Sequence, residues 1–338
     1  MTIKKSSMED IMPRLTRRQL PALAAAVLAA PSVASAQAFP SRPITIIVPF
    51  AAGGPTDTVA RLLGEAMGRD LNTSVVIENV GGAGGTLGAQ RLAAARPDGY
   101  TLLVHHIGMS TIPTLYRRLA YDPINGFETV GMITEVPMTI VGKRNIAANN
   151  LAELVALVRR ERDRINLANA GVGAASHLCG LLFQQAMNVP LTTVPYRGTG
   201  PAMNDLVAGT VDLMCDQTTN TTEHIRAGTI KAFAVTTRNR VGSLPDVPTA
   251  IEAGLPGFEV SVWHGLYAPR GTNPELVTRL SGALQSALRD PGLVRRFADL
   301  GTEPVPQAKA TPAAHRAFWM ADVARWRPVI QAAGQFAD

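Results

Sequence analysis

The strongest constraint on the fold is a repeated order of strand, glycine-rich turn and helix. Residues 44–67 contain a β-branched run, two glycines and then a segment whose apolar residues recur every three or four positions, as they do on one face of a helix. Residues 165–182 and 191–207 repeat this order. Such alternation is typical of α/β proteins, in which helices flank mostly parallel sheets. We therefore predict an α/β fold.

Nine segments are predicted to be strands, which fits two sheets better than one. These segments are residues 44–50, 74–78, 100–105, 136–142, 165–169, 191–196, 211–215, 231–237 and 260–267. Pro137 indicates a crossover between domains near residue 138, and the proline- and glycine-rich stretch at 245–257 indicates a return near 258. We expect domain 1 at residues 37–138 and 259–338, with domain 2 inserted at 139–258.

Residues 1–36 are predicted to be a secretory signal peptide. Arg17 and Arg18 precede the uncharged run 20–30, and small residues end the segment at Ala34–Ala36. The stretch from Thr16 to Leu20 also resembles a twin-arginine signal, so the export route, Sec or twin-arginine, stays open. Met12 is an alternative start to Met1. We expect a mature periplasmic protein that begins near residue 37.

The basic charge of the chain does not indicate a nucleic-acid surface. Residues 1–36 carry five of the Lys and Arg residues and two of the Asp and Glu residues, so half of the formal net charge of +6 belongs to the segment that is expected to be removed. The dense charge run at 159–164 has mixed signs, which is typical of a solvated helix end. We expect no nucleic-acid partner.

Motifs for cofactor, metal and hydrolytic chemistry are missing from the sequence. The run Gly81–Gly88 lacks the third glycine of a dinucleotide fingerprint, and no phosphate-loop, zinc-protease or nucleophile-elbow motif occurs. The spacings of the histidines and of Cys179, Cys215 and Asp216 match no zinc pattern. We expect no catalytic residue, no metal and no cofactor. The two cysteines are either small core residues or, in an oxidising compartment, a disulfide.

The three glycine-rich turns are candidate anion sites. In α/β sheets such turns lie at the carboxyl ends of strands, where ligands bind. The first N–H groups of the helix that follows have no internal partner, and glycine lets a ligand approach them. Thr56 and Ser176 can add hydroxyl donors, so a carboxylate could be held without a positive side chain. The alternative is that glycine only makes the bend while Thr56, Asp57 or Ser176 caps its helix.

Motifs along the whole mature chain resemble the extracytoplasmic solute receptors of tripartite tricarboxylate transporters, the Bug family. The resemblance rests on the segments 48–57 with 60–61, 82–85, 97–103, 171–178, 194–198, 244–249 with 252–254, and 263–269. It implies a two-lobed periplasmic binding protein of the Venus-flytrap kind, in which each lobe is a mostly parallel sheet flanked by helices.

The resemblance implies a function as well as a fold. Such a receptor, expected to be a monomer, captures a small organic carboxylate (a di- or tricarboxylate, or an aromatic or amino-acid carboxylate) and delivers it to a membrane permease. Two alternatives are a carboxylate receptor for a sensor system and an exported enzyme that uses the same cleft. No base–nucleophile pair at a recognisable spacing supports the enzyme.

Ligand-binding positions also follow from the resemblance. The turns that grip one ligand carboxylate correspond here to Phe50, Gly53, Gly54, Pro55, Thr56 and Asp57, and to Gly171, Gly173, Ala174, Ala175 and Ser176. Tyr196, Arg197 and Asp216 approach the variable end of the ligand. Arg197 either pairs with a second carboxylate or braces its loop through backbone carbonyls. We add His106, where the sequence departs from the family pattern, as it does in the polar run 215–222. The identity of the ligand is therefore not transferable.

Overall fold

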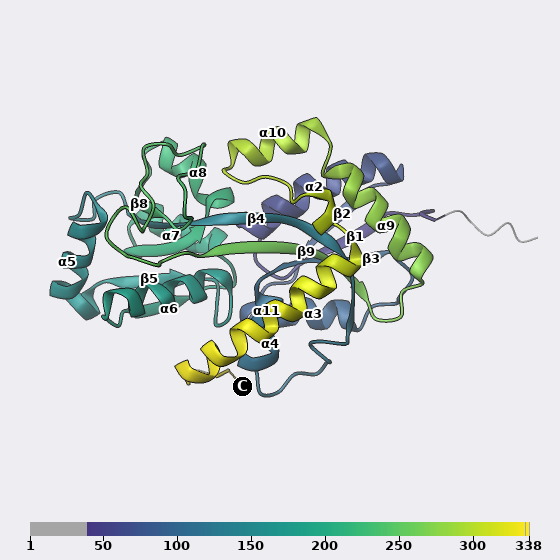
Figure 1. Cartoon of the computed structure of the whole chain (residues 1–338), viewed down its shortest axis with the longest axis horizontal. Coiled ribbons are helices and arrows are strands. Elements are labelled where there is room, and N and C mark those ends of the chain that lie inside the picture. The colour runs from purple at the N-terminus through teal and green to yellow at the C-terminus, as the bar shows by residue number, and fades with distance from the viewer. Residues whose placement is uncertain (1–38, 335, 338) are drawn as a thin grey trace, which may run out of the picture. The chain divides into compact units, whose positions relative to one another are not determined.

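The computed structural model describes residues 39–334, 336 and 337. The predicted signal peptide lies outside the described residues. The described part is a two-lobed α/β structure whose nine strands form a connected sheet in the order β2-β1-β3-β9-β4-β7-β5-β6, with β8 paired to β4 (Figure 1). The strands are β1 (Ile44–Val48), β2 (Val75–Asn79), β3 (Thr101–His106), β4 (Phe127–Lys143), β5 (Asn166–Asn169), β6 (Thr192–Pro195), β7 (Leu213–Gln217), β8 (Ile230–Val235) and β9 (Ser261–Pro269).

Two long strands connect the two halves of this sheet. β4 pairs antiparallel with β9 up to Pro137, and from Met138 onward it pairs with β7 and β8 instead. On either side of this shared region the strands are parallel: β1 with β2 and β3, and β5 with β6 and β7. Figure 1 shows β4 and β9 running side by side through the middle of the molecule.

Helices cover both faces of the sheet, as the periodicity predicts. They are α2 (Pro55–Leu71), α3 (Thr86–Ala93), α4 (Gly108–Leu115), α5 (Leu151–Glu161), α6 (Ala175–Met187), α7 (Thr199–Ala208), α8 (Thr218–Arg226), α9 (Pro274–Ala287), α10 (Pro291–Asp299) and α11 (Pro312–Ala333). Short 3₁₀ turns lie at Ala83–Gly85, Arg162–Arg164 and Gln307–Lys309. Within the described ranges, no helix combines the length and the apolar character needed to cross a membrane.

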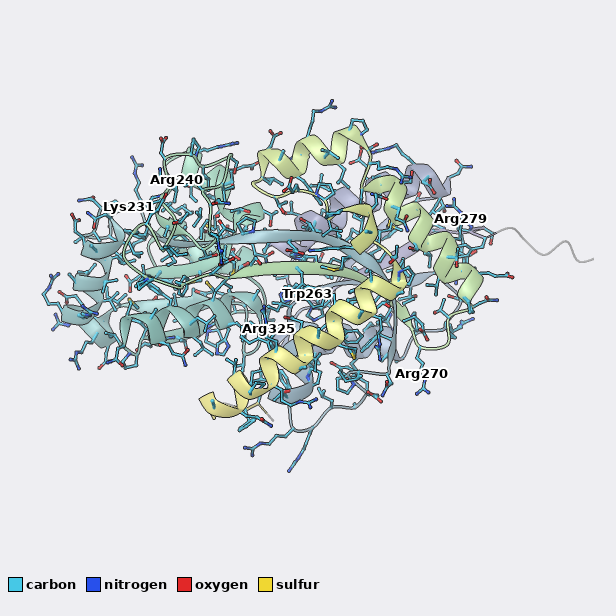
Figure 2. All side chains as sticks on the ribbon, in the orientation of Figure 1. Lys231, Arg240, Trp263, Arg270, Arg279 and Arg325 are labelled. Carbon is cyan, nitrogen blue, oxygen red and sulfur yellow. The ribbon has the colours of Figure 1, made fainter. Side chains whose placement is uncertain are left out.

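The long helix α11 is held by hydrogen bonds to β9 and to α4. Trp263 of β9, labelled in Figure 2, donates its indole N–H to Asp322 of α11 at 2.9 Å in a buried environment. Trp319 of the same helix is fully buried and donates to the carbonyl of Met109 in α4 at 3.0 Å. Because buried polar groups must be paired, these bonds determine where α11 crosses the sheet.

Four strand ends position the candidate site. β1, β5, β6 and β7 each lead through a short turn or directly into a helix, namely α2, α6, α7 and α8. The N-termini of these helices therefore lie at the carboxyl ends of their strands, which is the edge of an α/β sheet where ligands bind.

Candidate ligand-binding site

A small cavity lies where the strand ends of the two lobes meet. The atom-free space between its walls is about 250 Å³, open solvent included. Its walls come from the β1–α2 turn and β3 of one lobe, and from the starts of α6, α7 and α8 in the other. The lining residues are Phe50, Pro55, Thr56, His106, Ala170, Ala175, Ser176, Thr199, Asp216 and Gln217.

The helices that begin at this cavity have no side-chain caps. α2 begins after Gly54, α6 after Ala174 and α7 after Gly198, and none of the three receives a capping hydrogen bond from its N-cap side chain. α3, α4 and α8 also lack such a cap, whereas α5, α9, α10 and α11 are capped by Asn150, Asn273, Asp290 and Thr311. No N-cap side chain therefore occupies the first N–H groups of α2 and α6. Free N–H groups at the positive end of a helix favour an anion.

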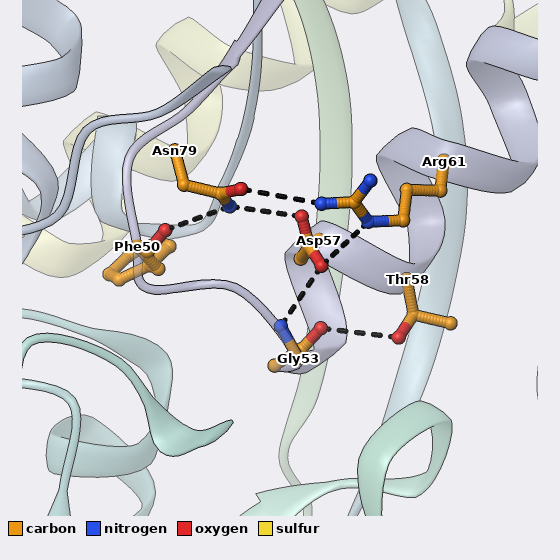
Figure 3. Close-up of polar contacts among 7 residues, drawn as sticks. Phe50, Gly53, Asp57, Thr58, Arg61 and Asn79 are labelled. Atoms are coloured by element: carbon orange, nitrogen blue, oxygen red, sulfur yellow. Dashed lines mark hydrogen bonds and ion pairs between the residues drawn. The ribbon is translucent and has the colours of Figure 1, made fainter. Parts of the chain in front are cut away.

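Asp57 braces the first turn instead of lining the cavity (Figure 3). One of its carboxylate oxygens accepts from the N–H of Gly53 and from Arg61 Nε, both at 2.9 Å, and the other accepts from Asn79 Nδ2 at 2.9 Å. Burial raises the pKa of this carboxyl, but the donors Arg61, Gly53 and Asn79 outweigh it and leave the pKa below its usual value. Asn79 also donates to the carbonyl of Phe50 at 3.1 Å, so the whole turn is held from β2.

Two histidines support the cavity from the first lobe. Thr56 Oγ1 shares a 3.3 Å hydrogen bond with Nε2 of the buried His264 in β9. His106 Nδ1 accepts from the N–H of Gly108 at 3.0 Å, and Phe50 stacks on the His106 ring at 4.7 Å between centroids. Burial lowers the pKa of His106 to about 3, so the ring is neutral at physiological pH. Since Nδ1 accepts, the neutral ring carries its hydrogen on Nε2 and can donate.

In the second lobe, several N–H groups of the turn at 170–174 are already used. Ala170 N–H donates to Ser176 Oγ at 2.8 Å, Gly171 N–H to Asn169 Oδ1 at 2.9 Å, and Gly173 N–H to His177 Nδ1 at 3.3 Å. Gly171 and Gly173 have φ of +101° and +83°, so their role is to shape the turn. The N–H groups of Ala175 and Ser176, at the start of α6, have no intrahelical acceptor.

Asp216 lies at the end of β7 and is 1% exposed. One of its oxygens accepts from Asn220 Nδ2 at 2.6 Å. Burial raises the pKa of Asp216 to about 6, against the lowering effect of hydrogen bonds from Asn220, the Gln217 N–H and Thr199. Among the residues that the structure describes, no Lys or Arg lines the cavity. The cations labelled in Figure 2 belong to the outer elements of the molecule: Lys231, Arg240, Arg270, Arg279 and Arg325.

Tyr196 and Arg197 lie outside the cavity. The Tyr196 hydroxyl donates to Asp205 at 2.6 Å, and the Arg197 side chain is exposed. Both residues line a neighbouring hollow together with Tyr116, Gly171 and Val172, among others. The carbonyl of Arg197 accepts from the N–H of Ala51 at 2.9 Å, which is a contact between the two lobes.

Further contacts close the rim of the cavity. The Tyr116 hydroxyl donates to the carbonyls of Ala83 at 2.7 Å and Val172 at 2.9 Å. Thr111 Oγ1 donates to the carbonyl of Gly173 at 3.2 Å. Two side-chain hydroxyls of the first lobe therefore bind backbone carbonyls of the second-lobe turn.

The prediction of site residues left out four residues that line or support the cavity: Ala170, Thr199, Gln217 and His264. Thr199 is the first residue of the helix after the third glycine-rich turn, and Gln217 directly follows Asp216. Both are therefore adjacent in sequence to segments that the prediction had already singled out. His264 belongs to the segment 263–269 that carries the resemblance, where nothing in the sequence assigned it a role.

Cys179 and Cys215 are free and buried, so they do not form a disulfide bond with each other.

Known proteins match the chain along nearly its whole described length. Residues 59–335 match the model of the family described as "Tripartite tricarboxylate transporter family receptor". The periplasmic binding protein BugD is 49% identical, with a TM-score of 0.86 over 89% of this chain and 100% of that chain. MatC from Rhodopseudomonas palustris, solved with bound malate, is 42% identical with a TM-score of 0.83 over 86% and 100%. An R. palustris protein solved with adipate is 33% identical with a TM-score of 0.82 over 88% and 98%.

Proposed function

The chain belongs to the tripartite tricarboxylate transporter receptor family, and from that premise we propose that it captures one small organic carboxylate and delivers it to a membrane permease of the tripartite tricarboxylate type. Proteins of this family are periplasmic receptors that bind carboxylates, and the structural neighbours are binding proteins rather than enzymes. The malate and adipate held by two neighbours suggest small dicarboxylates as the first candidates for a ligand screen.

The observation that carries this proposal is the convergence of three uncapped helix N-termini on one buried cavity without a cationic side chain. We infer that the ligand carboxylate accepts from free N–H groups at the starts of α2 and α6 and from the hydroxyls of Thr56 and Ser176. Phe50, Pro55, His106 and Ala175 then complete its surroundings. A carboxylate held in this way gains the helix dipole without an ion pair.

The remaining predicted residues are proposed to act indirectly. Gly53, Gly54 and Asp57 maintain the first turn, and Gly171, Gly173 and Ala174 maintain the second. Tyr196 and Arg197 lie at the rim, where they contribute to closure over the ligand. Asp216 is the exception, because it lines the cavity and is proposed to contact the other end of the ligand.

We place the hinge between the two lobes where the chain passes from one to the other, within β4 near residue 138 and just before β9 near residue 258. The domains are then residues 37–138 with 259–338, and residues 139–258. Thr236 supports this position, because its hydroxyl lies 3.1 Å from the backbone N and O of Met138 and 2.5 Å from the carbonyl of Val260. We expect the receptor to be a monomer. The predicted signal peptide would export the chain by the Sec or the twin-arginine route.

A ligand screen by thermal shift tests the receptor function. An acid present at 100 times its dissociation constant is expected to add about 2.7 kcal/mol to the free energy of unfolding. Analysis of the same mixtures for reaction products is expected to find the acid unchanged. Turnover would contradict the receptor, and the absence of a shift with every carboxylate would remove the cavity as a carboxylate site.

Thr56→Ala tests the anion grip. The change removes one neutral hydrogen bond, worth about 0.5–1.5 kcal/mol, so the affinity for the acid found in the screen is expected to fall about 2- to 12-fold in calorimetry. The matched control is Thr58→Ala in the same helix. Its hydroxyl donates to the carbonyl of Gly54 at 3.2 Å and does not line the cavity, so affinity should stay at the wild-type value. Equal losses in the two variants would show that Thr56 is only structural.

A further inference from the structure

The second-lobe wall of the cavity is rich in hydrogen-bond acceptors. Asp216 brings a carboxylate that is 1% exposed and accepts from Asn220 Nδ2 at 2.6 Å, with Thr199 as a second neutral side-chain donor. Gln217 is 2% exposed, and its Oε1 has no partner among the described residues. Both residues line the cavity. A buried acceptor without a donor costs free energy, so this wall is incomplete until a donor occupies it.

The surroundings of Asp216 contain no charge that could balance a second anion. Thr139 of β4 lies opposite Asp216 in the strand register, and its hydroxyl donates to the Asp216 carbonyl at 3.0 Å. Thr199 of α7 and Asn220 of α8 contribute neutral donors, and the thiol of Cys179 in α6 is nearby and neutral. His106, across the cavity, is also neutral. A ligand carboxylate beside Asp216 would therefore place two like charges in a buried site without a cation.

We propose that the ligand carries a hydrogen-bond donor on its carbon chain, an ammonium or a hydroxyl group, and that Asp216 and Gln217 accept from it. The proposal rests on the proposed function, in which the carboxylate of the same ligand is held at the starts of α2 and α6. The site then selects hydroxy- and amino-substituted carboxylates over unsubstituted acids of the same length. The buried carboxylate acts as the specificity-determining group.

Sets of acids that differ at one substituent test this selection. Succinate, malate and aspartate share a four-carbon skeleton and differ only by H, OH or NH₃⁺ at one carbon. Glutarate, 2-hydroxyglutarate and glutamate form the five-carbon set, and propionate, lactate and alanine the three-carbon set. Calorimetry at pH 8, where Asp216 is ionised, is expected to find at least one donor-bearing acid that binds 10-fold or more tightly than its unsubstituted partner. Comparison of the hydroxyl-bearing acid with the ammonium-bearing acid of each set shows which donor the site binds.

Variants of Asp216 assign the selectivity to this residue. Asp216→Asn keeps the shape and removes the charge, so a preference for an ammonium is expected to fall at least 10-fold. A preference for a hydroxyl is expected to survive in that variant, because the amide oxygen still accepts, and to disappear in Asp216→Leu. The matched control is Asp205→Asn, which changes a carboxylate that accepts from Tyr196 outside the cavity and should leave the preference intact. Circular dichroism confirms that each variant is folded.

The outcomes separate this inference from the proposed function. If the acids of a set bind equally, or if the preference survives in both Asp216 variants, the donor-selective wall is wrong while carboxylate capture stands. If no acid of these sets and none of the wider carboxylate screen binds, carboxylate capture by this cavity fails, and the selectivity fails with it.

Discussion

Replacing Gly200 by alanine is expected to weaken ligand binding about 100-fold, or ~2.7 kcal/mol, while each lobe stays folded. Gly200 is the second residue of α7. A Cβ at this position would lie 2.6 Å from the carbonyl oxygen of Ala52, 3.0 Å from the carbonyl carbon of Gly53 and 3.1 Å from the nitrogen of Gly54. These are backbone atoms of the first turn in the opposite lobe, so no flexible side chain can move aside. The two turns must separate, and the cavity between them opens.

The backbone conformation of Gly200 makes this prediction specific. Gly200 lies within α7 and is not among the glycines with positive φ, so alanine fits the helix itself. The change therefore acts on the contact between lobes and not on local folding. Gly282→Ala in α9 is the matched control, because a Cβ there meets nothing within 4 Å. That variant is expected to gain about 0.5–1 kcal/mol of stability with unchanged affinity. Calorimetry with wild-type affinity in Gly200→Ala would show that the lobes need not meet at this point.

Much of the fold was predictable because its signals are local. The β-branched runs at β1 and β6 and the helical periodicity of residues 59–67 are properties of short segments, and each predicted strand overlaps an observed one. The motifs that resemble the Bug family placed these segments in one order, and the family match confirms that identification. The glycine-rich turns at strand ends indicated the edge of the sheet at which the cavity lies.

The first half of β4 was not predicted, because long-range packing decides it. The strand begins at Phe127, whereas the sequence indicated residue 136. Register shifts against β9 between Thr129 and Gly131, and again between Met132 and Thr134, break the simple alternation of inward and outward residues. Gly131 is required at a point where a Cβ would meet the backbone of Ala310, which lies far away in the sequence.

The roles of individual site residues depended on partners that the sequence does not bring near. Asp57 looked like a ligand contact, but its carboxylate accepts a hydrogen bond from Asn79, 22 positions later, and stabilises the turn instead. His264 supports Thr56 across 208 positions. Arg197 followed a recognised turn, yet its side chain lines the outer hollow. Residue type and spacing located the site, whereas only the three-dimensional contacts separate lining residues from bracing ones.

Acidification from pH 7 to pH 5 is expected to lower the free energy of unfolding by several kcal/mol. His105, His106, His264 and His315 are buried, and burial lowers the pKa of each of them, to about 3 for His106 and His315 and well below the usual value for His105 and His264. In the unfolded chain these imidazoles have a pKa of about 6.5. Their contribution to stability is complete above pH 6.5 and is lost as the pH falls from there toward the pKa values of the folded state.

The size of the effect follows from this difference in proton binding. At pH 5 the folded rings of His106 and His315 remain neutral while each unfolded ring binds a proton, which costs about 2 kcal/mol per ring and about 4 kcal/mol for the two. His105 and His264 act in the same direction. Asp216 acts in the opposite direction. Its pKa is raised to about 6, so the penalty of burying its charge is largest above pH 6 and falls as the pH decreases. Protonation at pH 5 returns only about 1 kcal/mol. The free energy of unfolding of a native protein is about 5–15 kcal/mol in total, so the expected loss is a large fraction of it.

Urea denaturation followed by tryptophan fluorescence measures this loss, since Trp263, Trp319 and Trp326 are all buried. The denaturation midpoint is expected to be much lower at pH 5 than at pH 7. His315→Gln removes one of the four rings at a position away from the cavity, where Nε2 lies 3.1 Å from the Tyr267 hydroxyl. Glutamine places an amide near that nitrogen and cannot titrate. The difference in unfolding free energy between pH 7 and pH 5 should therefore shrink by about 2 kcal/mol in this variant, whatever its stability at pH 7. A midpoint at pH 5 equal to or above that at pH 7 would mean that protonated histidines are accommodated in the folded protein, which their burial without acidic partners argues against.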